Sequence, residues 1–280
     1  MKNIEREKVK LHLLKKVSRA AAAAFLLAAA VCLLCGAANG AKQPAVSARR
    51  CLVMDAGSGA VLYEKNADER SLIASTTKIM TGWLACQLVN LDAEYEIPAE
   101  AVGVEGSSIY LQAGERLSGE DLLRGMLLHS GNDAATALAI AACGSEAAFV
   151  EEMNLTAQDL GLSSTHFANP HGLDDEGNYS TARDLARLTA FTLCDPNFRA
   201  AVSTRTAVIG GGRALTNHNK LLWRVEGCIG VKTGYTQAAG RILVSAAERG
   251  GRTIIIVTID DPDDWRDHER LYEWFFRTDA

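Results

Sequence analysis

The sequence ASTTKIMT, residues 74–81, places a serine three positions before a lysine at the start of an apolar stretch. Apolar residues recur at mostly helical spacing from there to Leu91, which predicts a helix over residues 75–91. On a helix, Ser75 and Lys78 share one face, with their Cβ atoms about 5–6 Å apart. The lysine amine can therefore reach the serine hydroxyl.

Two further short motifs follow in the chain. The run SGN at residues 130–132 opens an alanine-rich helical stretch, and KTG at residues 232–234 lies in a β-rich run. From average composition, a Ser-x-x-Lys motif is expected about once by chance in a chain of this length, and each of the other two in about one such chain in twenty. Their joint occurrence, in this order and in these contexts, makes coincidence remote.

This combination of residue types is suited to nucleophilic catalysis. A serine hydroxyl is a poor nucleophile until a base takes its proton. For Lys78 to act as that base, its pKa must fall from about 10.4 towards neutrality. Burial lowers a lysine pKa, and a nearby cation such as Lys232 lowers it further. Ser130 can then relay a proton between Lys78 and a leaving amine, while Asn132 offers an amide donor and acceptor to a substrate backbone.

The third motif is suited to holding an extended substrate. On an edge strand, the residues Lys232, Thr233 and Gly234 let a peptide pair alongside them, and the glycine leaves room for close approach. Lys232 is also expected to orient the motif serine and to attract a substrate carboxylate. The backbone N–H groups of Ser75 and Tyr235 are expected to form an oxyanion hole, in which one lost donor typically costs about 10²–10³ in rate.

Outside the motifs, the pattern predicts strands at both chain ends and helices between them. Five runs read as strands, the last three as an antiparallel meander: residues 50–55, 60–65, 230–235, 241–247 and 253–259. Further helices are predicted over residues 120–126, 132–142, 145–161, 181–193 and 265–276. The chain is therefore expected to be of the α/β (α+β) class, with one sheet assembled from both ends and a separate helical lobe in the middle.

The N-terminal region has the features of an export segment. Residues 1–19 carry seven Lys/Arg and two Glu, and an uncharged run follows from Ala20 to Ala38. Small residues after that run would admit a signal peptidase. An uncleaved membrane anchor is the alternative, although an alanine-rich run gains little from entering lipid. We expect residues 1–40 to be a signal peptide or N-terminal membrane segment, residues 41–49 a linker and residues 50–280 a catalytic domain outside the cytoplasm.

Composition and spacing exclude several other classes. The net charge is −5 overall and, without the +5 of residues 1–19, −10 for the remainder, which argues against nucleic-acid binding. The five cysteines beyond the export segment contain no C-x-x-C, and the histidines lack metal-ligand spacing. We expect buried free thiols, no metal and no cofactor. His129 precedes Ser130, but no aspartate with a clear orienting role follows, so a Ser-His pair is disfavoured.

The three motifs, together with the segment NPHGL at residues 169–173, resemble the low-molecular-mass penicillin-binding proteins, which are serine-type D-alanyl-D-alanine carboxypeptidases. The resemblance covers nearly all of the chain from about residue 46 onward. It implies a β-lactamase/transpeptidase-like fold: an antiparallel sheet flanked by helices, with an inserted all-helical subdomain and the site at their junction. The implied substrate is the peptidoglycan stem pentapeptide, with release of the terminal D-alanine through a Ser75 acyl-enzyme.

The resemblance also implies β-lactams as covalent inhibitors and places an arginine near the substrate carboxylate. Arg266 occupies that position, with Arg270 close by. Two departures stand out. Tyr235 replaces a residue that is often histidine in the family. The chain ends at Ala280, so we do not expect the second, β-rich domain and the C-terminal membrane-binding helix of many relatives, which leaves the N-terminal segment, if uncleaved, as the membrane contact.

Three other functions could use the same set of motif residues. A D,D-endopeptidase would cut peptide cross-links and is barely disfavoured by the sequence. A β-lactamase needs rapid deacylation, and the Glu-x-x-Leu-Asn motif that supports it in one large group of these enzymes is absent. A penicillin-binding sensor would be acylated without turnover, yet every catalytic position is intact. The carboxypeptidase is therefore the preferred interpretation.

Overall fold

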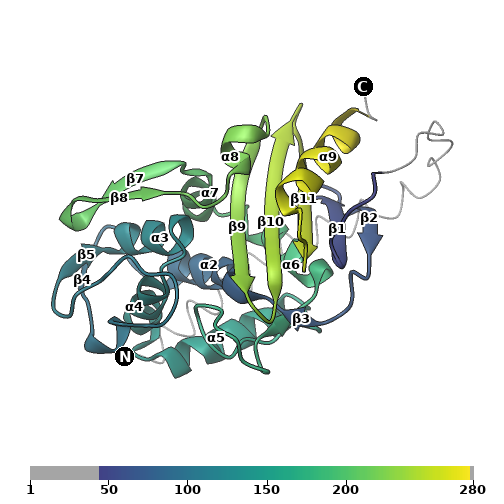
Figure 1. Cartoon of the computed structure of the whole chain (residues 1–280). Helices are drawn as coiled ribbons and strands as arrows, with labels where there is room; N and C mark the ends of the chain where they lie inside the picture. Colours follow the sequence, from purple (N-terminus) through teal and green to yellow (C-terminus); the bar gives the residue numbers. More distant parts are fainter. Residues whose placement is uncertain (1–43, 278–280) are drawn as a thin grey trace.

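The structure, a computed structural model, describes residues 44–277 (Figure 1). The predicted export segment, residues 1–40, lies outside the described residues. Residues 44–49 lead into the first strand without forming a helix or strand. Val46 and Ala48 are nevertheless buried against the sheet, so this part of the predicted linker packs with the domain that follows.

The main sheet has five strands, all antiparallel to their neighbours, in the order β2-β1-β11-β10-β9. The strands are β1 (Arg50–Asp55), β2 (Val61–Lys65), β9 (Cys228–Thr236), β10 (Gly240–Arg249) and β11 (Arg252–Ile259). The prediction of one sheet built from both chain ends, with a C-terminal meander, is confirmed. Because β9 lies at an edge, one side of the strand that carries the Lys-Thr-Gly motif has no strand partner in the sheet.

Helices cover both faces of the sheet (Figure 1). Side chains on a strand point alternately to the two faces of a sheet. Leu243 and Ile256 point to one face, where they pack with helix α9 (Asp264–Arg277). Their neighbours Val244 and Val257 belong to the core on the opposite face. There, α6 (Ala182–Thr192) contacts β1 and β11, and the start of α2 (Lys78–Leu88) contacts β9. The alternation of side chains along these strands thus produces two separate cores, one on each face of the sheet.

The middle of the chain forms the predicted helical lobe beyond β9 (Figure 1). Its helices are α2, α3 (Gly119–Leu128), α4 (Asn132–Cys143), α5 (Glu146–Asp159) and α7 (Pro196–Ser203). The helix predicted over residues 75–91 begins as a 3₁₀ turn, η1 (Ala74–Thr77), and ends three residues early. The reason for the early end is that Val89 is extended, with φ −104° and ψ 134°.

Several short elements lie outside the predicted set. They are β3 (Ser71–Leu72), β4 (Glu94–Glu96), β5 (Arg116–Ser118), β6 (Tyr179–Ser180), β7 (Thr206–Ile209), β8 (Arg213–Thr216), α8 (Leu221–Arg224) and the 3₁₀ turns η2 (Ala99–Ala101) and η3 (Gly210–Gly212). Strands of two to four residues carry too little periodicity to be recognised. The expectation of buried thiols holds for Cys51 but is wrong for Cys194, which is exposed.

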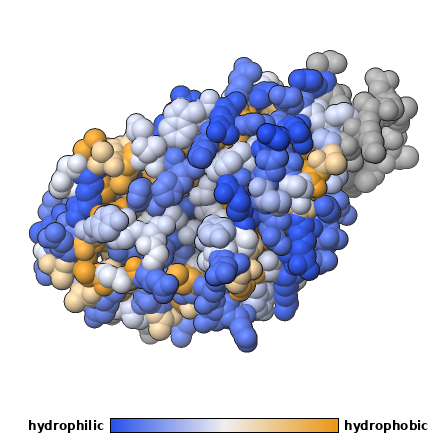
Figure 2. All heavy atoms as spheres, viewed as in Figure 1, coloured by the Kyte–Doolittle hydropathy of each residue, from blue (hydrophilic) through white to orange (hydrophobic). Residues whose placement is uncertain are grey.

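The surface differs between the two ends of the molecule. In Figure 2, hydrophobic residues gather over the lobe, whereas hydrophilic residues cover the end of the sheet at α9. Val208 on β7 is among the exposed apolar residues of the lobe, at 71% exposure. Within residues 44–277, no single helix has the length and hydropathy to span a bilayer; α4 and α5 meet that criterion only as a pair bent by 84°.

Candidate active site

Ser75 lies in a sharp turn at the junction of the sheet and the lobe. The turn η1 contacts β9, and the preceding residue, Ala74, adopts a left-handed φ of 44°, which is uncommon for a residue with a side chain. The Thr76 hydroxyl donates to the Ile73 carbonyl at 2.6 Å and braces this turn. Ala74, Thr76 and Thr77 are buried, whereas Ser75 is partly exposed. The fold therefore presents the serine, and not its neighbours, to solvent.

Lys78 is fully buried, and its amine lies 3.0 Å from the Ser75 hydroxyl, so the predicted contact is present. The other two neighbours of the amine are Asn132 Oδ1 at 2.6 Å and the His171 carbonyl at 2.5 Å. Burial, reinforced by the charge of Lys232, holds the pKa of Lys78 well below its ordinary value, and the Asp133 carboxylate acts in the opposite direction. Burial dominates because desolvation disfavours the charged form.

The three partners of Lys78 fit a neutral amine. The amide oxygen of Asn132 and the carbonyl oxygen of His171 can only accept hydrogen bonds. They take the two hydrogens of a neutral amine, which leaves its lone pair for the third partner. The Ser75 hydroxyl is that partner, and a hydroxyl can donate. When the amine is neutral, the arrangement therefore aims its lone pair at the serine proton.

Lys232 is the second buried cation of the site. It is 1% exposed, and its amine donates to the Thr233 carbonyl at 3.0 Å. Burial lowers the pKa of Lys232 to about 7. Ser130 is also buried and adopts a left-handed φ of 64° in the turn between α3 and α4. Among residues 44–277, no hydrogen bond joins the Ser130 hydroxyl to either lysine, so its relay role stays a prediction.

Asn132, predicted to bind substrate, also positions the base. Its Oδ1 accepts from Lys78, while its Nδ2 donates to the Glu105 carbonyl at 2.5 Å and its backbone N–H donates to the Ser107 carbonyl at 2.7 Å. Each end of the amide keeps a second hydrogen-bonding position for a substrate. The sequence pattern does not indicate this double role, because Lys78 and Asn132 are 54 residues apart in the chain.

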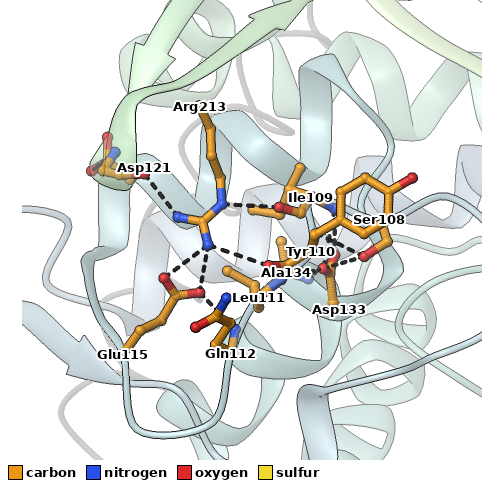
Figure 3. Close-up of polar contacts among 11 residues, drawn as sticks. Ser108, Ile109, Tyr110, Leu111, Gln112, Glu115, Asp121, Asp133, Ala134 and Arg213 are labelled. Carbon is orange, nitrogen blue, oxygen red and sulfur yellow. Dashed lines mark hydrogen bonds and ion pairs between the residues drawn. The ribbon is translucent and has the colours of Figure 1, made fainter.

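A loop over Asn132, residues 105–115, is clamped from two sides (Figure 3). On one side, the buried Asp133 carboxylate accepts from the Ser108 hydroxyl at 2.5 Å and from two backbone N–H groups of the loop. On the other, the Arg213 guanidinium donates to two loop carbonyls, at 3.0 and 3.2 Å, and pairs with Glu115 at 2.8 Å. The sequence patterns indicate neither set of contacts, because Asp133 and Arg213 act on a loop that is distant from them in the chain.

The segment at residues 169–173 forms another wall of the site. Asn169 closes a turn by accepting from Gly172 N–H at 2.7 Å, and Gly172 has a left-handed φ of 93°. A Cβ at this glycine would lie 2.0 Å from the Ala74 carbonyl oxygen, so only glycine fits. The turn delivers the His171 carbonyl to Lys78. Burial, followed by the charge of Lys78, lowers the pKa of His171 to about 4.

The Lys-Thr-Gly strand passes close to the serine turn. A Cβ on Gly234 would lie 3.3 Å from the Ser75 backbone nitrogen and 3.2 Å from the Ile73 carbonyl oxygen. The predicted close approach is thus made by the protein's own backbone. Thr233 is partly exposed and Tyr235 is 67% exposed, so the outer edge of β9 is accessible. This is where an extended peptide could pair.

Arg266 lies in the first turn of α9 and makes no hydrogen bond or ion pair, among the described residues, with the side chains around Ser75 and Lys78. Its guanidinium is 64% exposed and pairs with Asp263 at 3.5 Å. The helix start is nevertheless anchored near the motif strand, because Asp264 pairs with Arg241, whose Cα partner on β9 is Tyr235. A contact between Arg266 and a substrate carboxylate stays a prediction. Within the described part of the chain, no group of three or more His, Cys, Asp or Glu side chains could hold a metal ion.

Comparison with known proteins agrees with this geometry. A family model described as D-alanyl-D-alanine carboxypeptidase, Peptidase S11, matches residues 37–263. The carboxypeptidase DacC of Escherichia coli K12 is 37% identical over 251 residues, which cover 84% of this chain and 63% of that protein. DacF of Bacillus subtilis 168 is 35% identical, with coverages of 75% and 56%. The chain thus spans about three-fifths of the length of these relatives.

Solved structures show the same architecture. The crystal structure of the Streptomyces K15 DD-transpeptidase aligns with a TM-score of 0.79 at 34% identity, covering 85% of this chain and 100% of that one. Penicillin-binding protein 6B from Escherichia coli aligns with a TM-score of 0.79 at 32% identity, with coverages of 85% and 80%. The antiparallel sheet, the flanking helices and the helical lobe are therefore shared with penicillin-binding proteins, as the sequence predicted.

Proposed function

The chain belongs to the D-alanyl-D-alanine carboxypeptidase family, and from this premise we propose that it is a serine D,D-carboxypeptidase acting on peptidoglycan stem pentapeptides. The observation that carries the proposal is the buried Lys78 amine, which lies 3.0 Å from the Ser75 hydroxyl and hydrogen-bonds, within residues 44–277, otherwise only to two acceptor oxygens. That amine can remove the serine proton without the help of a metal or of a histidine base.

Acylation proceeds by attack of Ser75 on the carbonyl carbon of the penultimate D-alanine. Lys78 takes the serine proton as the Oγ–C bond forms. The backbone N–H groups of Ser75 and Tyr235 receive the negative charge that develops on the carbonyl oxygen. The C–N bond then breaks, and the leaving nitrogen gains a proton from Ser130, which recovers one from Lys78. The products are D-alanine and a Ser75 ester.

Deacylation repeats these steps with water. Lys78, neutral again, takes a proton from a water molecule as its oxygen attacks the ester carbon. The C–Oγ bond breaks, and Ser75 takes back the proton. One water molecule is consumed, and the shortened peptide carries a new carboxylate. A β-lactam acylates the same serine, but its leaving group stays attached, which explains how such a compound acts as a covalent inhibitor.

The substrate backbone is held along the outer edge of β9, between Thr233 and Tyr235, and by the free positions of the Asn132 amide. Its terminal carboxylate is bound by the Lys232 amine, the Thr233 hydroxyl and the Arg266 guanidinium. Support for this placement comes from the exposure of the strand edge and from the anchoring of the α9 start near Tyr235. No cofactor takes part in these steps.

The site is proposed to work outside the cytoplasm, where peptidoglycan is. Support comes from the basic stretch of residues 1–19 and the uncharged run after it, which have the order of an export signal. Association with a membrane is proposed only through this segment, where it is retained.

Turnover of a pentapeptide ending in D-Ala-D-Ala tests the proposal. The exported domain should release many equivalents of D-alanine per protein molecule, and pre-incubation with benzylpenicillin should block that release and add the mass of one inhibitor to Ser75. Labelling without any release of D-alanine would support a sensor, and fast hydrolysis of nitrocefin would support a β-lactamase. Either outcome would overturn the proposed function.

A further inference from the structure

The segment at residues 44–49 is fastened to the domain on the face of the sheet that α9 covers. Val46 and Ala48 are buried in the core that this helix shares with the sheet. The Lys65 amine, on β2, donates to the Val46 carbonyl at 3.3 Å and to the Ala48 carbonyl at 2.6 Å. The segment joins the domain to the N-terminal region, and the mechanism derived above leaves its attachment without a use.

A single hydroxyl of this segment lies between two buried carboxyl groups. The Ser47 Oγ is 2.7 Å from Asp261 Oδ1 and 2.9 Å from Asp267 Oδ2. The Ser47 backbone N–H also donates to Asp267 Oδ2. Asp261, in the turn before α9, is 1% exposed, and Asp267, in the first turn of α9, is 2% exposed. Ser47 therefore fixes the segment to the start of α9 through two aspartates.

The number of hydrogens in this arrangement indicates a shared proton. A serine hydroxyl has one hydrogen and can donate it to only one carboxylate. The second contact is attractive only when the other carboxyl group is protonated and donates to Oγ. Asp267 accepts from the Ser47 N–H and so fits the ionised member. Asp261 fits the protonated member, because its buried Oδ2 has no hydrogen-bond partner among residues 44–277, which is costly for a charged group.

The surroundings of the two aspartates disfavour a second negative charge. Burial raises the pKa of Asp261, the hydrogen bond from the Ser47 hydroxyl opposes this effect, and the charge of Asp267 adds to it. The Lys65 amine approaches the same segment, but its hydrogen bonds go to carbonyl oxygens. Within residues 44–277, neither aspartate forms an ion pair with a lysine or arginine that would replace the missing proton.

The other ionisable groups around the pair do not supply that compensation. Two arginines of this region pair with neighbouring aspartates, Arg241 with Asp264 at 2.9 Å and Arg266 with Asp263 at 3.5 Å. The remaining groups are a thiol, a phenol and an imidazole, all of which stay neutral near pH 7. Burial raises the pKa of the first two and lowers that of the third to about 3; they are Cys51 on β1, Tyr63 on β2 and His268 on α9.

We propose that Ser47, Asp261 and Asp267 form a proton-dependent clasp, which holds residues 44–49 on the domain while the two carboxyl groups share one proton and opens when that proton leaves. The proton passes from Asp261 to water, and no other bond changes. Two buried carboxylates then compete for one hydroxyl hydrogen, so the charged pair is stabilised by opening to water.

Opening of the clasp changes how far the domain can lie from the chain that precedes it. Residues 44–49 span at most about 20 Å when extended, and this length becomes available once the segment leaves the sheet. The clasp is thus a tether that is short in acid and longer at higher pH. This inference concerns the attachment of the domain and does not rest on the proposed function, since neither readout below uses catalytic activity.

Hydrogen exchange at the Ser47 amide, measured by NMR in the full-length protein, tests the clasp. The protection factor removes the intrinsic pH dependence of exchange and reports local opening. In the wild type it should fall by about 10-fold or more between about pH 5 and about pH 8, because each pKa unit is a tenfold change in population. Asp261→Asn still offers a hydrogen to Ser47 Oγ but cannot ionise, so its protection factor should change by less than about twofold.

Unfolding by denaturant gives a second readout. Because the folded-state pKa of Asp261 is raised, its stabilising contribution is complete below the unfolded-state pKa and is lost as pH rises through the folded-state value. Asp261→Asn should therefore unfold at a higher denaturant concentration than the wild type at about pH 8, and the difference should shrink towards about pH 5.

Asp263→Asn is the matched control. Asp263 lies in the same turn as Asp261, its side chain is 48% exposed, and only its backbone N–H contacts the pair. This variant should keep the pH dependence of the wild type in both readouts. A protection factor at Ser47 that does not change with pH in the wild type would overturn the inference. So would an Asp261→Asn variant in which protection and stability follow pH as they do in the wild type.

Discussion

Two clusters of buried polar side chains lie on opposite faces of the sheet, and each contains a serine hydrogen-bonded to a nitrogen base. In the open cluster, Ser75 lies 3.0 Å from the Lys78 amine. In the closed cluster, under α9, Ser245 lies 2.7 Å from His268 Nδ1 and 2.7 Å from the Tyr272 hydroxyl. Measured by the serine–base distance alone, the closed cluster is the better candidate for catalysis.

Two properties distinguish the clusters: the solvent exposure of the serine and whether every hydrogen-bonding position of the base is occupied. Ser245, His268 and Tyr272 are all fully buried, and His268 is satisfied on both sides because Thr258 lies 3.0 Å from its Nε2. Burial lowers the pKa of His268 to about 3, so this histidine is neutral and structural. Ser75 is partly exposed beside the free edge of β9. A nucleophile therefore needs a base and also a path for the substrate.

The largest predicted effect comes from the two serines. Ser75→Ala should reduce D-alanine release by a factor that approaches about 10⁶, as happens when a serine enzyme loses its nucleophile. Ser245→Ala should leave kcat/KM within about twofold, yet lower the free energy of unfolding by about 1–3 kcal/mol, because buried polar groups lose a partner. Steady-state kinetics and denaturant unfolding check the pair. Loss of activity in Ser245→Ala with unchanged stability would contradict the comparison.

The next effect concerns the base of the open cluster. Lys78→Arg keeps a positive charge but cannot deprotonate, so acylation should slow by about 10²–10⁴-fold, the usual contribution of a general base. Stopped-flow acylation by a fluorescent penicillin measures this step without deacylation. An acylation rate close to that of the wild type would assign the base to another residue.

Much of this cluster could be predicted from the sequence. The three-residue spacing of Ser75 and Lys78 on a helix and the edge position of the KTG run at residues 232–234 follow from local patterns. The contacts of Asp133 and Arg213 could not, because both act on a loop that is distant from them in the chain. Helix α7 is absent from the predicted set, although the sequence carries two standard start signals for it. Asp195 caps the helix, and Pro196 is its first residue.

An intermediate effect is expected from the clamp that supports the open cluster. Arg213 is a positioning residue, because it holds loop 105–115 over Asn132 without reaching the reacting atoms. Arg213→Ala should lower kcat by about 10-fold and at most by about 10²-fold, the cost of a small misplacement of the catalytic groups, with little change in KM.

Arg199→Ala is the matched control for the clamp. It breaks a different Arg–Glu pair, with Glu248 at 2.7 Å, which joins α7 to β10. That variant should keep wild-type kcat. Equal losses in both variants would mean that Arg213 acts only through overall stability.

The smallest effect lies in the pH profile. Catalysis needs Lys78 neutral, so kcat/KM should rise with pH through its lowered pKa. Binding of the substrate carboxylate needs Lys232 charged, and because burial lowers its pKa to about 7, kcat/KM should fall as pH rises past that value. Because Lys78 and Lys232 interact, the apparent pKa values of the acid and alkaline limbs describe the pair of lysines together. Lys232→Arg, which does not titrate, should move the alkaline limb upward, and an unmoved limb would contradict the assignment.

Direct titration of the buried lysine tests the central claim. In protein labelled with ¹³C at lysine Cε, the resonance that disappears in Lys78→Ala can be followed with pH. We expect a midpoint well below 10.5, the ordinary value for lysine, so that the amine is substantially neutral under the conditions of catalysis. A midpoint near 10.5 would leave Ser75 without its base and would contradict the account.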